Sequence, residues 1–207
     1  MPGEIRAAGT VVAARPGPRG IEVLVLRRSG RHRFLPGFVV FPGGAVDAAD
    51  AARAERWFGD PGEAARACGV RELAEETGLL PTAEGLVPSA GGGVGPEHVS
   101  DFPGGTPSPE QLPEISHWVA PEDVPVRFDA RFFAVAAPRG LDPVPDGREA
   151  IRAWWARPSD LLEANNSGGC LLYWPTMKVV EGLARCRSVE EVLGADIPQV
   201  EPEGQVI

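Results

Sequence analysis

The segment 60–79, "DPGEAARACGVRELAEETGL", constrains the fold most, because it carries the signals of a single helix at both ends. Asp60 can cap the helix, Pro61 suits the first helical position, and Glu63 stands where a capping box places its acid. Gly78 supplies the C-terminal stop. Small or apolar residues share one side of this helix, namely Ala67, Val70, Leu73, Ala74 and Thr77. The sequence therefore predicts a helix that packs this side closely against a sheet.

Three glutamates, Glu72, Glu75 and Glu76, crowd the opposite side of the same helix. Like charges at these spacings cost about 0.2–0.5 kcal/mol per pair. A solvated surface would explain them, as would ion pairs with Arg66 or Arg71. A cation site would explain them too, because Mg²⁺ takes oxygen ligands and removes the repulsion between carboxylates.

Apolar, β-branched runs on both sides of this helix predict a sheet. Residues 5–15 and 21–28 form two antiparallel strands around a Pro/Gly turn, and 38–41 form a third short strand that ends in Gly43 and Gly44. A short helix is predicted within 47–59, and a long Gly/Pro-rich loop over 84–113.

The second half of the chain continues with strands and ends with helices. The strands are predicted at 115–120, 130–138 and 149–157, and the helices at 158–165, 175–186 and 188–196. This order predicts an α/β fold with a mixed sheet covered by helices on both faces. We expect one domain over 1–198 and a C-terminal tail at 199–207.

Charge and composition exclude several classes of protein. The net charge of −9 argues against a nucleic-acid partner, because such binding needs a positive surface. Three widely spaced cysteines predict free thiols in a reducing compartment. The N-terminal segment has no apolar signal region and no apolar run approaches 18 residues, so a cytoplasmic protein without a membrane partner is expected. A homodimer is left open.

The segment from Glu63 to Leu79 resembles the box of the Nudix hydrolases, G-x5-E-x7-R-E-U-x-E-E-x-G-U, where U is a bulky apolar residue. Every position from the first glutamate onward is in register. The start departs from the pattern, because 18 residues separate Gly44 from Glu63 where the pattern has five. Residues 45–62 therefore hold an insertion. The resemblance implies a Nudix-type α/β/α sandwich, here with extra C-terminal helices.

The same resemblance implies roles for individual residues. Glu72, Glu75 and Glu76 match the family's ligands for Mg²⁺ or Mn²⁺, and the carbonyl of Gly43 matches a backbone ligand. The residues expected to pair with these carboxylates and orient them are Arg71 and Glu63, so the expected catalytic set is Glu63, Arg71, Glu72, Glu75 and Glu76. A glutamate outside the box often adds a ligand or a base, and Glu149 is the candidate here.

A second motif, "LVLRRSGRHRFLPGFVVFPGG", resembles the pattern of the coenzyme A diphosphatase branch, particularly its long, peroxisomal-type members. Arg28, Ser29, Arg33 and Gly37 fall in register, as does the run from Phe41 to Gly44. Val25 and Leu26 depart from the pattern. Arg28, Arg33 and Gly44 are the expected substrate-binding residues, and arginine suits phosphate oxygens.

This branch implies a metal-dependent diphosphatase that cleaves coenzyme A or an acyl-CoA to a phosphopantetheine and adenosine 3′,5′-bisphosphate. One alternative is the same chemistry on ADP-ribose, a dinucleotide or another nucleoside diphosphate derivative. The other is a Nudix module that binds a nucleotide without hydrolysing it. Trp154, Trp155 and Trp174 could stack on an adenine, but core packing explains them more simply.

Overall fold

The first strand organises the sheet, because it has partners along both of its edges. In the computed structural model, which describes residues 4–31, 34–89, 102, 104–122, 124 and 126–200, β1 is Ile5–Gly17. A tight turn joins it to the antiparallel β2 (Gly20–Arg28), as predicted. On its other edge β1 runs parallel to β8 (Arg127–Ala136), from the pair Ile5 and Arg127 to the pair Ala14 and Ala136. β1 therefore lies at the centre of a mixed sheet.

The remaining strands extend the sheet outward from these three. β7 (Glu114–Val119) is antiparallel to β8, whereas β3 (Val39–Val40) and β9 (Ala150–Ala156) both pair with β2. β4 (Gly43–Ala45) pairs with the start of β1. β1 pairs with β2 only near their turn, and residues 39–45 lie between the diverging strands, where the Val11 N–H donates to the Pro42 carbonyl at 2.9 Å. The sheet is thus split beside the glycines.

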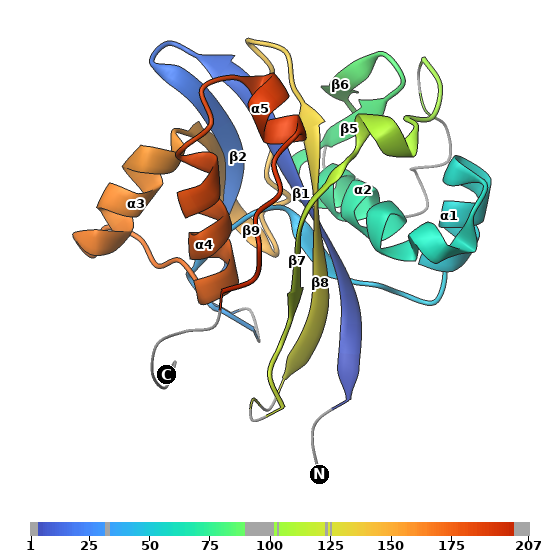
Figure 1. The fold of residues 1–207 in the computed structure, drawn as a ribbon, viewed down its shortest axis with the longest axis horizontal. Helices are drawn as coiled ribbons and strands as arrows, with labels where there is room; N and C mark the ends of the chain where they lie inside the picture. Colours follow the sequence, from blue (N-terminus) through green and yellow to red (C-terminus); the bar gives the residue numbers. More distant parts are fainter. Residues whose placement is uncertain are drawn as a thin grey trace.

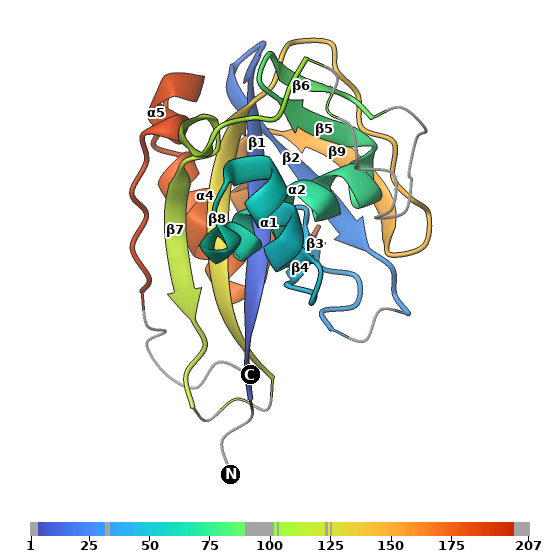
Figure 2. The ribbon, with the colours of Figure 1, turned by 90° about the vertical axis from the view of Figure 1, so that its right-hand side faces the viewer.

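Helices cover both faces of this sheet, as predicted (Figures 1 and 2). The helices on one face are α1 (Asp50–Phe58) and α2 (Ala64–Thr77), and those on the other are α3 (Pro158–Asn166), α4 (Trp174–Leu183) and α5 (Val189–Leu193). Strand alternation on β1 explains the two layers, because Val11 and Ala13 join the core under α2 while Val12 and Ala14 join the core under α4.

The predicted helix after Asp60 is confirmed, with one change at its start. Pro61–Glu63 form a 3₁₀ turn, η1, and α2 follows directly. Asp60 accepts the Gly62 N–H at 2.8 Å, but Glu63 makes no capping bond and instead pairs with Arg66. Gly78 ends α2 with φ 65°, as expected.

The expected loop over 84–113 is wrong for residues 85–88. β5 (Leu79–Thr82) and β6 (Gly85–Pro88) form a separate antiparallel hairpin, and a 3₁₀ turn, η3, spans Pro109–Gln111. The hairpin forms because Leu79, Leu80 and Leu86 are buried against the core under α2. Residues 90–101 lie outside the described part of the chain, as do residues 201–207 of the expected tail.

Two further sequence-based expectations concern the cysteines and membrane spans. Cys68, Cys170 and Cys186 are free thiols, and the first two are buried. Among the helices in the described ranges, none combines the length and the hydropathy needed to cross a bilayer.

Candidate functional site

A pair of glycines brings α2 into contact with the sheet. Gly9 on β1 and Gly44 on β4 are directly opposite each other. A Cβ on Gly9 would lie 1.8 Å from the Ala65 carbonyl oxygen, and a Cβ on Gly44 would lie 2.2 Å from Glu72 Oε1. At Gly9 the atoms met belong to the backbone, so only glycine permits the approach of α2, whereas a Cβ at Gly44 would displace the carboxylate of Glu72. Gly9 therefore fixes how close the acidic helix lies to the sheet, and Gly44 leaves room for the Glu72 carboxylate.

The three box glutamates are held against this backbone. Glu76 is 3% exposed, and its Oε2 accepts the Gly43 N–H at 3.0 Å. Glu72 and Glu75 accept hydrogen bonds from Arg71 Nη1 at 2.8 and 3.3 Å. The second oxygen of Glu75 is buried and has no hydrogen-bond partner. Gly43 contributes its N–H here, whereas the role predicted for its carbonyl stays a prediction.

Burial raises the pKa of all three carboxyl groups. Burial is the largest cause for Glu76, followed by the charge of Glu72, and together they hold its pKa well above the usual range. Burial likewise raises the pKa of Glu75 to about 7 and raises that of Glu72, with Arg71 acting in the opposite direction. The site therefore holds carboxylates whose charge the protein compensates only in part.

Arg71 joins the glutamates to the insertion. Its Nε and Nη2 donate to the two oxygens of Asp50 at 3.1 and 3.0 Å, and Nη1 faces Glu72 and Glu75. The Asp50 side chain is 0% exposed. Burial alone would raise its pKa, but hydrogen bonds from Arg71, the Asp47 N–H and Arg53, together with the charge of Arg71, outweigh burial and lower it. Asp50 thus fixes the guanidinium that orients two of the carboxylates.

Sequence reasoning did not assign this role to Asp50. It expected Glu63 to act with Arg71, but the Glu63 carboxylate accepts the Arg66 Nε–H at 2.8 Å. Glu63 precedes α2, so roughly 12 Å of helix separates it from Glu72. The catalytic role of Glu63 stays a prediction. The sequence offered one indication of a partner for Arg71, namely an acidic residue in the insertion that interrupts the box. Both Asp47 and Asp50 fit that description, so the sequence could not choose between them.

Replacing Asp50 by asparagine should uncouple Arg71 from α1. We expect the free energy of unfolding to fall by about 3 kcal/mol, because a buried guanidinium loses its fully buried anion. Turnover or metal affinity should fall about 10- to 100-fold, as is usual when a partner of a metal ligand is lost. Urea denaturation and Mn²⁺ titration calorimetry measure the two effects.

Asp47→Asn is the matched control for this variant. Asp47 lies three residues before Asp50, outside α1; it is 46% exposed, and its carboxylate is 3.7 Å from Arg71 Nε. Its change should cost less than about 1 kcal/mol. Equal effects of the two variants would show that Asp50 does not position Arg71.

Glu149 and Arg28 belong to other elements but line the same cavity as Glu72. A cavity of about 400 Å³ is lined by Gly43, Gly44 and Glu72 together with Arg28 and Glu149. The Ser29 N–H donates to the Glu149 carbonyl at 2.7 Å, which ties the two loops together. The charge of Arg28 lowers the pKa of Glu76 and that of Glu149 raises it. The structure thus brings these predicted residues together, whereas Arg33 lies outside the described residues.

A divalent cation fits this set of side chains. Within the described ranges no three carboxylates already converge as a ligand set, and Arg71 engages two of them. The buried oxygen of Glu75 without a hydrogen-bond partner and the burial of all three carboxyl groups nevertheless mark acids whose ionised form a cation would stabilise. Oxygens of Glu72, Glu75 and Glu76 are the hard ligands that Mg²⁺ or Mn²⁺ would take.

Stability in metal-free buffer should depend on pH. A carboxyl group whose pKa is higher in the folded than in the unfolded chain stabilises the fold when protonated, and this stabilisation is lost as pH rises. For Glu75 the loss runs from its ordinary pKa of 4.5 to about 7. We therefore expect the Tm in EDTA to fall between pH 5 and pH 8. Mn²⁺ should restore it most at the higher pH, because the metal binds the deprotonated form. A Tm that rises over this interval in EDTA would contradict the expectation.

Comparison with known proteins agrees with this arrangement. Residues 4–174 match the family described as the NUDIX domain. A solved structure of a NUDIX hydrolase from Alicyclobacillus acidocaldarius is similar, with a TM-score of 0.78, 34% identity, and coverage of 95% of this chain and 99% of that one.

Two curated relatives match parts of the chain. A putative nudix hydrolase 7 from Caenorhabditis elegans is 32% identical over 137 residues, which are 62% of this chain and 43% of the relative. The acyl-coenzyme A diphosphatase NUDT19 from Gallus gallus is 32% identical over 152 residues, which are 54% of this chain and 38% of the relative. The chain thus spans less than half the length of these relatives. The match over residues 4–174, together with the acidic helix and the sheet beneath it, shows that the chain belongs to the Nudix hydrolase family.

Proposed function

We propose that this chain is a divalent-metal-dependent diphosphatase that cleaves coenzyme A or acyl-CoA into (acyl-)phosphopantetheine and adenosine 3′,5′-bisphosphate. The observation that carries the proposal is the cavity in which Glu72, Glu149 and Arg28 share a space with a predominantly apolar, aromatic lining. A substrate with a diphosphate in its middle and a long uncharged arm on one side fits this distribution of charge.

The acidic part of the cavity suits a diphosphate. The two glycines of β4 let phosphate oxygens approach the backbone. Arg28 supplies a guanidinium for those oxygens. Nudix hydrolases generally use divalent metals such as Mg²⁺ or Mn²⁺. When bound, such a metal neutralises phosphate charge and lowers the pKa of a coordinated water.

The residues of this chain would orient the reactants around that metal. Arg71, held by Asp50, fixes the carboxylates of Glu72 and Glu75, and Gly43 fixes that of Glu76. Glu149 lines the same cavity as Glu72, where it would add a ligand or accept a proton from the attacking water.

The coenzyme A motif and one relative support the choice of substrate. Arg28, Gly43 and Gly44, which belong to the motif "LRRSGRHRFLPGFVVFPGG", line the cavity. The chicken relative is named an acyl-coenzyme A diphosphatase, and the matched region covers about half of this chain.

A substrate panel tests the proposal directly. The protein is incubated with Mg²⁺ or Mn²⁺ and CoA, decanoyl-CoA, ADP-ribose or diadenosine tetraphosphate, and products are identified by mass spectrometry. We expect adenosine 3′,5′-bisphosphate from the two CoA substrates and no turnover in EDTA. Preferential cleavage of ADP-ribose or the dinucleotide would overturn the choice of substrate. Nucleotide binding without cleavage of any compound would overturn the enzymatic proposal and favour a binding module.

A further inference from the structure

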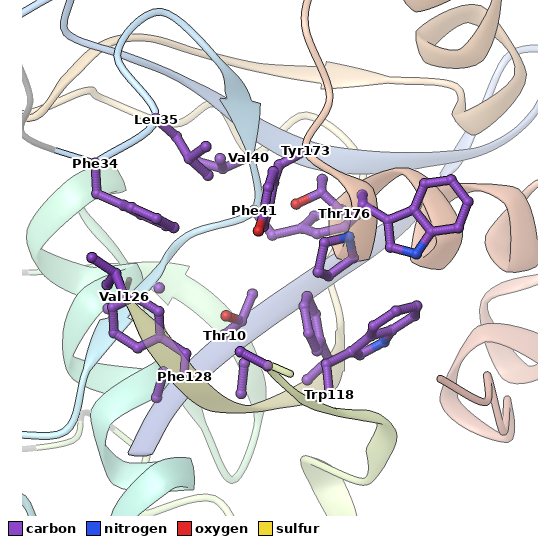
Figure 3. Close-up of a pocket in the computed structure, with 18 of the residues that line it drawn as sticks. Thr10, Phe34, Leu35, Val40, Phe41, Trp118, Val126, Phe128, Tyr173 and Thr176 are labelled. Carbon is purple, nitrogen blue, oxygen red and sulfur yellow. The ribbon is translucent and has the colours of Figure 1, made fainter. Parts of the chain in front are cut away.

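The cavity has an aromatic part that the diphosphate does not need. This aromatic chamber is lined by Phe34, Trp118, Phe128, Ala130, Tyr173 and Trp174. Figure 3 labels four of them, Phe34, Trp118, Phe128 and Tyr173. The Phe34 ring lies 5.4 Å from that of Phe128 and 6.1 Å from that of Tyr173, centroid to centroid. The chamber is built from the 34–41 loop, β7, β8 and the start of α4, and not from the acidic helix. It is therefore a part of the same cavity that elements other than the acidic helix supply.

The polar groups of the two tryptophans are already bonded within the protein. Trp118 Nε1 donates to Ser116 Oγ at 2.8 Å, and Trp174 Nε1 donates to the Val200 carbonyl at 2.8 Å. Their rings consequently present carbon to the chamber. Such a wall favours apolar ligand atoms, since a polar group buried there without a partner is costly.

The charged side chains of the cavity come from elements other than those that form this wall. Among the described lining residues, Arg28, Glu72 and Glu149 are the charged ones. Glu72 is on α2, Arg28 ends β2 and Glu149 precedes β9, and the Ser29 N–H joins the last two segments by donating to the Glu149 carbonyl at 2.7 Å. Nothing charged is thus available, among the described lining residues, to accompany an anion into the chamber.

This asymmetry distinguishes the two arms of the proposed substrate. One arm of acyl-CoA is 3′-phosphoadenosine, which carries a phosphate anion, and the other is pantetheine with its acyl chain, which is uncharged. Burying the phosphate among aromatic rings would leave it without a free cation. Lys178 Nζ is 4.5 Å from the centroid of the Trp174 ring, but Lys178 is paired with Glu181 at 2.9 Å and does not line the cavity. We propose that the aromatic chamber binds the pantetheine and acyl arm, so that the protein selects acyl-CoA over free CoA. This inference rests on the proposed function and adds the orientation of the substrate.

The rim of the chamber supports the same orientation. Val119, Val126 and Val200 line the cavity and are 38%, 46% and 45% exposed. Exposed apolar side chains that cluster around a pocket mark a contact surface. These valines would cover a chain that extends beyond the chamber, and each methylene buried there favours binding by about fourfold.

The first test measures kcat/KM for CoA, acetyl-CoA, hexanoyl-CoA and decanoyl-CoA. We expect a rise of at least tenfold from acetyl-CoA to decanoyl-CoA. Two probes, each carrying one arm, then locate the site: decanoyl-pantetheine and adenosine 3′,5′-bisphosphate, measured as competitive inhibitors. A flat chain-length series, or no inhibition by 1 mM decanoyl-pantetheine, would overturn the proposal.

A variant that fills the aromatic chamber tests which arm of the substrate binds there. Ala130→Phe places a ring into the cavity from β8, and Ala136→Phe, on the exposed end of the same strand, is the matched control. We expect Ala130→Phe to raise the inhibition constant of decanoyl-pantetheine at least tenfold relative to that of the bisphosphate, and Ala136→Phe to change neither. The opposite ratio would place adenosine in the chamber. If Ala130→Phe does not fold, the chain-length series still tests whether the chamber binds the acyl arm.

Failure of this inference is distinguishable from failure of the proposed function. Equal cleavage of CoA and every acyl-CoA would overturn the orientation while leaving the diphosphatase intact. Absence of CoA and acyl-CoA cleavage would overturn the function itself.

Discussion

Replacing Glu76 by glutamine should lower kcat by about 10²- to 10⁴-fold while the fold is retained. Glutamine has the shape of glutamate and can still accept the Gly43 N–H, which is 3.0 Å from Glu76 Oε2. It lacks the negative charge that a metal ligand or base requires. Steady-state kinetics with Mg²⁺ and the best substrate of the panel measure the loss.

The same variant should be more stable than the unmodified protein in EDTA at pH 8. Burial and the charge of Glu72 raise the pKa of Glu76, so the ionised carboxylate destabilises the folded state at that pH. Glu55→Gln on the outer side of α1 is the control and should leave both kcat and Tm nearly unchanged. Undiminished hydrolysis by Glu76→Gln would show that the acidic helix is not the catalytic site.

Replacing Gly9 by alanine should lower stability strongly. The new Cβ would lie 1.8 Å from the Ala65 carbonyl oxygen and 2.8 Å from the Gly69 nitrogen, both backbone atoms that no rotamer change can move. We expect the free energy of unfolding to fall by about 3 kcal/mol. Activity should fall too, because α2 must move away from β4 and take Glu72 with it.

Urea denaturation of Gly9→Ala beside Gly30→Ala tests this expectation. A Cβ added at Gly30 would meet no atom within 4 Å beyond its own chain neighbours, so the same chemical change there should alter stability by less than about 1 kcal/mol. Equal stabilities of the two variants would mean that α2 does not rest on the glycine pair.

The sequence predicted the elements that carry their own signals. α2 ends at Gly78 as expected, and the residues expected to face the sheet, from Ala67 to Thr77, are buried. The β1–β2 hairpin was predictable because a Pro/Gly turn separates two β-branched runs. Such features depend on neighbours within a few positions, which a single sequence displays.

Features that depend on distant partners are harder to predict. Asp50 contacts Arg71 only because the insertion folds back over α2, and the residues next to Asp50 in the sequence do not indicate this contact. The segment of β6 was predicted as a loop because it contains Gly85 and Pro88, which are typical of loops. The burial of its leucine in the core, which makes it a strand, depends on distant residues. The prediction for Glu149 came from family resemblance alone, and its place beside Glu72 depends on the pairing of β9 with β2.

The cavity takes its two parts from different elements. α2 and β4 hold the box carboxylates, whereas β7, β8 and the start of α4 hold most of the aromatic chamber. The backbone at Gly43 and Gly44 is shared by both. Substitutions at chamber positions such as Ala130 can therefore accumulate without disturbing the carboxylates. In evolutionary terms, a lineage built on this scaffold can change its preferred substrate by drift in the chamber while its hydrolytic chemistry is inherited unaltered.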